Sequence, residues 1–179
     1  MSMQHPRGPG GPRDAGPRGG GSHGGGPRDG GPRGGGPRTD DFPRPGHHDL
    51  SAIIVEGDAR VLVEVAERLG QALARPPDRR DQLTTSQIRS VFGTVRQIEM
   101  NWPVLDEEDD RARRSGRELI LLKPKLAYQA RRASGRGVEN LRSVLDPAID
   151  LIGNDRRRFQ NFVDFFEAIL AYHKFFGGQ

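Results

Sequence analysis

The 179-residue sequence contains no cysteine, so it can form neither a disulfide nor a thiolate metal site and has no cysteine nucleophile. Its apolar runs, such as 52–55 and 119–122, are far shorter than the roughly 18 residues that a membrane-spanning helix needs. The N-terminus has no apolar stretch of the kind found in secretory signals. We therefore expect a soluble, cytoplasmic protein with no membrane partner.

Apolar residues are also scarce in the first 48 residues, which hold 16 of the 25 glycines and 9 of the 14 prolines. Pro-Arg recurs there at five-residue intervals, whereas collagen requires glycine at every third position. With little to bury, this segment cannot offset the entropy of ordering. We expect a disordered Gly/Pro/Arg-rich tail over 1–48, which either follows a phosphate backbone without sequence preference or serves as a solubilising tail or loose tether.

Residues 49–179 have ordinary globular composition, with 21 basic and 20 acidic side chains. Apolar residues recur at helical spacing, and no pair of strands is evident. We predict one all-α domain over 49–179, a small bundle of about five helices. The expected helices run over about 59–75, 84–102, 110–133, 138–152 and 155–176. The apolar residues 53–55 have no second strand to pair with and are expected to pack as a loop.

Two polar features mark helix starts. Thr84 and Gln87 have the spacing of a capping box, in which each side chain binds the other residue's backbone N–H. The five acids at 106–110 suit the positive end of a helix dipole, and the arginines that follow neutralise much of their charge. A divalent-cation site is the alternative interpretation of the acidic run, and we favour the helix start.

The third expected helix has a basic face opposite its leucines. On a helical wheel this face gathers Arg114, Arg117, Lys125, Tyr128, Arg131 and Arg132. Cations can bind phosphates and a ring can stack on a base, which is how proteins recognise single-stranded RNA. A solvated arginine face is the alternative. Pro124 is expected to kink the helix and can divide this face in two.

The last expected helix is rich in aromatic residues, with seven apolar or aromatic positions on one arc. Such a helix lies in the centre of the core or is shared with a partner. His173 lies among apolar neighbours, which favours a core histidine with its hydrogen bonds satisfied over a catalytic one.

The sequence offers no constellation for catalysis. It has no glycine-rich phosphate loop, no serine with plausible His/Asp partners, and only a fragment of a metal site at His47-His48-Asp49. We expect a binding or assembly protein without enzymatic activity, metal, cofactor or small-molecule substrate.

Three stretches resemble the small helical subunit of type III-A (Csm) CRISPR interference complexes. They are Leu-Thr-Thr-Ser-Gln-Ile-Arg at 83–89, Leu-Lys-Pro-Lys-Leu-Ala-Tyr-Gln-Ala-Arg-Arg at 122–132, and Phe-Phe-Glu-Ala-Ile-Leu-Ala-Tyr-His-Lys-Phe-Phe-Gly-Gly at 165–178. The resemblance covers roughly 80–178 and does not extend to the tail. It implies a non-enzymatic all-α subunit whose copies stack beside the backbone subunits, next to the duplex of guide RNA and target RNA.

The same resemblance implies RNA-facing residues at the matched positions, which are Arg89, Lys123, Lys125, Tyr128, Arg131 and Arg132. We add Arg96, Arg136 and Arg142 on charge alone. The implied partners are the guide RNA, the target RNA, the other subunits of the effector complex and copies of this chain. The alternatives are a protein-interaction adaptor that docks a partner through its aromatic last helix, and a metal-dependent nuclease that uses the acidic run together with His47-His48-Asp49.

Overall fold

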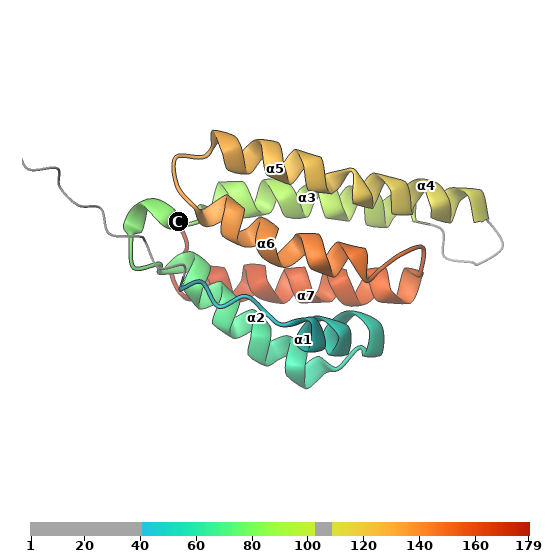
Figure 1. The fold of residues 1–179 in the computed structure, drawn as a ribbon, viewed down its shortest axis with the longest axis horizontal. Helices are drawn as coiled ribbons and strands as arrows, with labels where there is room; N and C mark the ends of the chain where they lie inside the picture. Colours follow the sequence, from blue (N-terminus) through green and yellow to red (C-terminus); the bar gives the residue numbers. More distant parts are fainter. Residues whose placement is uncertain (1–40, 103–108) are drawn as a thin grey trace, which may run out of the picture. The chain divides into compact units, whose positions relative to one another are not determined.

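The computed structural model describes residues 41–102 and 109–179 (Figure 1). All regular structure in these two ranges is helical, which confirms the expected all-α class. The elements are α1 (His47–Ser51), the π-helical turn η1 (Ala52–Glu56), α2 (Ala59–Ala74), the 3₁₀ turn η2 (Arg79–Asp81), α3 (Thr85–Asn101), α4 (Asp109–Ile120), α5 (Leu122–Arg132), α6 (Gly137–Asp150) and α7 (Arg156–Phe175). No helix in the described ranges is both long enough and apolar enough to cross a bilayer.

The expected disorder of the tail concerns residues 1–40, which lie outside the described residues. Its last part, 41–48, is described. There Phe42 packs against the hydrophobic core, and Arg44 Nε donates a hydrogen bond to Ser143 Oγ of α6 at 3.0 Å. α1 then begins at His47. Structured residues therefore extend into the segment that the composition assigns to the tail.

The apolar residues after α1 form η1, and the expectation of a loop there is wrong. The wide turn places Ile53 and Ile54 side by side in the interior, where η1 contacts both α2 and α7. Asn161 Nδ2 of α7 donates to the carbonyl oxygen of Ile54 at 3.0 Å. Gly57 ends the turn with a φ of 77°, and Asp58 caps α2 by accepting two backbone N–H groups at 2.8 and 3.1 Å.

α3 begins with the predicted capping box. Thr84 Oγ1 accepts a hydrogen bond from the Gln87 N–H at 3.2 Å, and Gln87 Oε1 accepts one from the Thr84 N–H at 2.9 Å. At the other end of α3, Trp102 is buried and stacks on Phe159 of α7 with ring centroids 4.4 Å apart. Both ends of α3 are therefore fixed by specific contacts.

The predicted long third helix is divided into α4 and α5, which lie end to end (Figure 1). Pro124 has no N–H to donate to the carbonyl of Ile120, four residues earlier, and the helix is interrupted between them at Leu121. α4 packs against α3, whereas α5 packs against α6. The predicted division of the helix near Pro124 is confirmed, and the two halves have different neighbours.

The start of α4 agrees with the helix-start interpretation of the acidic run. α4 begins at Asp109, so the last two acids of the run lie in its first turn. The expected stop at Pro103 and the first three acids of the run fall within 103–108, outside the described residues.

α7 lies at the centre of the core, as its aromatic arc predicts. It packs against α2, α3 and η1. Its rings at positions 159, 162, 165 and 166 are buried, whereas Phe175 near its end is 76% exposed. Asp155 caps the helix by accepting the Arg158 N–H at 3.0 Å, as expected for a helix that opens at this position.

His173 of α7 is a core histidine whose ring is hydrogen-bonded, which confirms the prediction. It is 1% exposed, and its Nε2 lies 2.8 Å from the carbonyl oxygen of Leu83. Burial lowers the pKa of His173, and the hydrogen bond to Leu83 opposes part of this effect. The ring is therefore neutral near pH 7, with the Nε2 proton donated to the carbonyl.

Candidate nucleic-acid interface

A groove of about 970 Å³ lies between the first half of α3 and α5. The groove exists because α4, and not α5, covers the second half of α3. There Ser115 Oγ of α4 donates a hydrogen bond to the Asn101 carbonyl of α3 at 3.4 Å. One wall is formed by α3 with Ser86, Gln87 and Ser90. The other wall is Leu121, Pro124, Lys125, Tyr128, Gln129, Arg132 and Ala133, and Val138 of α6 is the buried residue of the lining.

Tyr128 and Arg132 form a fixed pair on the α5 wall. Arg132 Nη1 donates to Tyr128 Oη at 3.2 Å, and the guanidinium carbon lies over the ring, 5.5 Å from its centroid. The two residues are four positions apart, so they occupy successive turns of one helix face. Both interactions hold the ring in place although Tyr128 is 62% exposed.

Four of the predicted RNA-binding cations surround the groove. Lys125 and Arg132 line it, Arg131 is exposed beside them on α5, and Arg89 of α3 lines a hollow of about 610 Å³ that shares Ser86 with the groove. Arg89, Lys125 and Arg131 make no ion pair with any acid in the described ranges. Their charges therefore face solvent uncompensated.

The basic surface continues along α4 beyond the break. Arg114 and Arg117 are exposed there and likewise have no ion-pair partner within 41–102 or 109–179. Because α4 and α5 lie end to end, these two arginines extend the cationic surface past the groove (Figure 1). Six of the eleven predicted residues thus lie on α4 and α5 as exposed groups: Arg114, Arg117, Lys125, Tyr128, Arg131 and Arg132.

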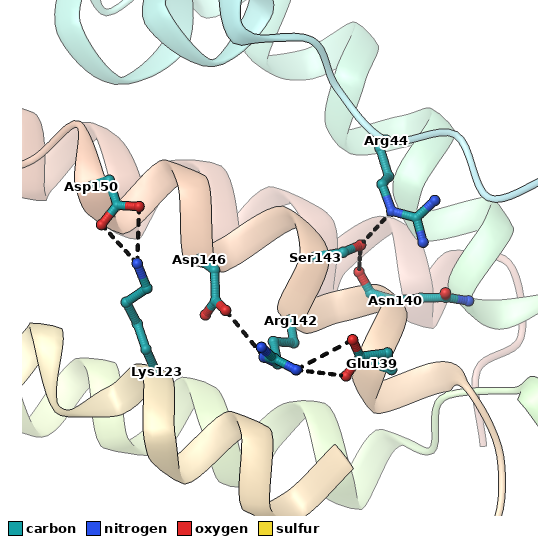
Figure 2. A network of polar contacts seen from close by, with 8 residues as sticks. All are labelled: Arg44, Lys123, Glu139, Asn140, Arg142, Ser143, Asp146 and Asp150. Carbon is teal, nitrogen blue, oxygen red and sulfur yellow. Dashed lines mark hydrogen bonds and ion pairs between the residues drawn. The ribbon is translucent and has the colours of Figure 1, made fainter. Parts of the chain in front are cut away.

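Lys123 and Arg142 are held in ion pairs at the contact of α5 with α6 (Figure 2). Lys123 Nζ lies 2.7 and 2.9 Å from the two carboxylate oxygens of Asp150. Arg142 lies between two carboxylates of its own helix, 3.1 Å from Glu139 and 3.1 Å from Asp146. Neither cation lines the groove, and both are compensated by acids.

Asp146 shows how closely this contact is packed. Burial raises the pKa of its carboxyl group, and the neighbouring Arg142 opposes that rise. One carboxylate oxygen of Asp146 is held at 3.1 Å by Arg142 Nε. On this side of α6, the Lys123–Asp150 pair therefore joins α5 to α6, and the pairs of Arg142 lie within α6.

Arg96 and Arg136 are also placed away from the groove lining. Arg96 pairs with Glu99 one turn later on α3 at 2.6 Å. Arg136 is half-buried at the start of α6, where its backbone N–H donates to Asp81 Oδ1 of η2 at 2.9 Å. The structure thus separates the predicted residues into an exposed set on α3, α4 and α5 and a set engaged within the fold.

Sequence reasoning missed the α3 wall. Ser86 and Ser90 are exposed on either side of Arg89, and Arg79 and Arg80 of η2 line a smaller hollow of about 260 Å³ next to Gln87. The spacing of the two serines places them on one face of α3. That signal is weak, because small hydroxyl residues are common on any solvated helix.

The described residues contain no group of three His, Asp or Glu side chains that could hold a metal ion. Asp49 of the His47-His48-Asp49 fragment lies 3.9 Å from Arg68, and Asp110 of the acidic run lies 3.6 Å from Arg113.

Comparison with known proteins gives one match. A family model described as Csm2 Type III-A matches residues 56–179, from the end of η1 to the last residue. No curated protein and no solved structure matches the chain significantly.

Proposed function

Because this chain belongs to the Csm2 family of small subunits of the type III-A CRISPR complex, we propose that it is a non-catalytic subunit that binds RNA through the groove and the exposed cations around it. Its partners are then the guide RNA, the target RNA, the other subunits of the effector complex and copies of itself.

The observation that carries this proposal is the concentration of uncompensated positive charge on one side of a nearly neutral body. Lys125, Arg131 and Arg89 are exposed without acidic partners in the described ranges, and no acid lines the groove. Protein surfaces that bind nucleic acids have this character, because each cation releases counterions from a phosphate. Elsewhere on the fold, Lys123, Arg142 and Arg96 show that cations are readily neutralised by neighbouring acids.

Such a surface contacts phosphates and shape and does not distinguish base sequence. In a guide-directed complex this is sufficient, because base pairing between guide and target supplies the sequence recognition. Copies of the subunit stacked along the guide–target duplex would each contribute one cationic surface. Cleavage and signalling then belong to other subunits.

Replacing Lys125, Arg131 and Arg132 together by alanine tests this assignment. RNA affinity, measured by fluorescence anisotropy of a labelled oligonucleotide, is expected to fall and to depend less on salt. Losing three phosphate contacts makes the negative slope of log K against log [salt] shallower by about 2 for a single strand. Helical content by circular dichroism is expected to be unchanged, because all three side chains are exposed.

A matched control replaces Arg60, Arg157 and Lys174 by alanine. These three side chains are also exposed, and replacing them removes the same total charge. They lie on α2 and α7, across the bundle from α5 (Figure 1). The control is expected to keep most of the affinity and slope. An equal loss in both variants would show that net charge alone drives binding and would refute the placement of the site.

A further inference from the structure

We propose that the α3–α5 groove binds unpaired bases, so that this chain binds single-stranded RNA in preference to duplex RNA. The inference rests on the proposed RNA-binding function and specifies the substrate of the same site. It follows from features of the groove that a surface for phosphates alone does not need.

The first feature is the apolar part of the lining. Leu121, which immediately precedes α5, and Pro124 and Tyr128 of α5 all line the groove, and Leu121 and Tyr128 are 47% and 62% exposed. Contact with an apolar surface does not stabilise a bound phosphate, whereas the face of a base is stabilised when it is removed from water. The groove therefore offers a binding surface for bases beside its cations.

The second feature is the orientation of Tyr128. Arg132 donates to its hydroxyl oxygen and lies over its ring, so the ring is already held in the groove wall before any ligand binds. A platform fixed in this way loses little side-chain entropy when a base stacks on it. Arg132 can meet the adjoining phosphate with the donors that remain.

The third feature is the opposite wall. Ser86 and Ser90 present hydroxyl groups, which rotate and can either donate or accept a hydrogen bond. Gln87 uses its Oε1 on the Thr84 N–H, which leaves its amide nitrogen as a donor. Such groups can form hydrogen bonds with the polar edge of any base. The groove is therefore expected to bind bases without strong sequence preference.

The charge and size of the groove identify RNA as its occupant. Lys125 and Arg132 line it, and none of the described Asp or Glu residues does, which favours a polyanion over an uncharged apolar segment of a protein. Its volume of about 970 Å³ is at the upper end of the range for small-molecule sites, which suits a nucleotide. In an A-form duplex the faces of the bases are stacked inside and are inaccessible to the ring.

The test uses the full chain and one 20-nucleotide RNA, single-stranded or annealed to its complement. Tyr128→Ala is expected to weaken single-strand binding about tenfold, the scale of one lost base–aromatic stack, and to leave duplex binding unchanged. Tyr128→Phe keeps the ring but loses the hydrogen bond from Arg132, and it is expected to retain most of the affinity. Phe175→Ala removes an aromatic ring of similar exposure on α7 and is expected to have no effect.

Photo-crosslinking with 4-thiouridine in the same RNA gives a second readout. The cross-linked peptide is expected to contain Tyr128 when the RNA is single-stranded, with a much lower yield from the duplex. Equal yields from both forms, or cross-links confined to the tail, would overturn the inference.

The two proposals fail differently. If the Lys125, Arg131 and Arg132 triple variant loses RNA binding but Tyr128→Ala does not, the RNA-binding function stands and the groove is not a base site. If neither change affects RNA binding, the proposed function itself is wrong. If Tyr128→Ala instead abolishes copurification of another protein subunit while RNA affinity is kept, the groove binds protein and this inference is refuted.

Discussion

Acidification should destabilise the fold through His173, the one buried histidine in the described ranges. Its ring is 1% exposed and donates a hydrogen bond of 2.8 Å to the Leu83 carbonyl. The backbone of Gly178 lies against the ring, since a Cβ added there would come within 2.0 Å of it. The neutral imidazole is therefore the form that the fold accepts.

The sign and size of the effect follow from proton uptake. Burial lowers the pKa of His173 in the folded chain below its ordinary value of 6.5. Below pH 6.5, His173 therefore binds a proton in the unfolded chain more readily than in the folded chain. The free energy of unfolding consequently decreases as the pH decreases. One proton gives a slope of at most about 1.4 kcal/mol per pH unit, and at most about 1.4 kcal/mol is lost between pH 7.5 and 5.5.

Urea denaturation at several pH values measures this loss directly. Trp102 is the single tryptophan and is buried against Phe159, so its fluorescence reports unfolding of the core. His173→Gln is the control, because glutamine keeps an N–H donor for the Leu83 carbonyl but does not titrate. The difference between the two pH profiles removes the contributions of all other titrating groups.

Two results would refute this reasoning. The first is a free energy of unfolding that is constant from pH 7.5 to 5.5. The second is the same pH slope in His173→Gln as in the unmodified chain, which would assign the effect to other groups. An NMR titration of the ring in the folded chain gives an independent check, since its pKa should lie below 6.5.

Five further substitutions probe the packing and the site. Gly70→Ala places a Cβ 2.5 Å from a side-chain carbon of α7 and should lower the free energy of unfolding by about 1–3 kcal/mol. The added Cβ of Gly93→Ala meets nothing within 4 Å, so this substitution should leave the free energy of unfolding unchanged or raise it by up to about 1 kcal/mol. Urea denaturation measures both. Phe159→Ala removes a buried ring stacked on the tryptophan and should cost about 3–5 kcal/mol in the same assay. Lys123→Ala should leave RNA affinity unchanged, because Lys123 forms an ion pair with Asp150 of α6. Lys125→Ala should reduce RNA affinity, because Lys125 lines the groove. A larger loss of affinity in Lys123→Ala than in Lys125→Ala would mean that the placement of the interface is wrong.

The helix boundaries that follow from local chemistry were predictable from the sequence. Thr84 and Gln87 specify a cap through groups three residues apart, and Asp155 does the same for α7. The interruption before Pro124 was predictable because proline has no N–H to donate to the carbonyl four residues earlier, although α6 accommodates Pro147 without a break. The apolar arc of α7 likewise predicts its burial in any compact arrangement of helices.

The features that depend on tertiary contacts were not predictable in this way. Ile53 and Ile54 lie in a π-helical turn that packs against α7, about 100 residues later in the sequence, and no local pattern shows this contact. A helical wheel places Lys123 near the apolar arc but cannot show that Asp150 of another helix will neutralise it. The groove arises because α4 and α5 pack on different partners, so only the assembled bundle reveals its α3 wall.

The groove and the core share almost no residues, and this separation bears on how the family can diverge. Among the lining residues only Val138 is buried, and the others are exposed or half-buried. Substitutions such as those at Ser86 or Gln129 therefore change what the groove contacts without removing a side chain from the interior. The lining of the groove and the thermodynamic stability of the fold can then change independently, while the same helical bundle is retained.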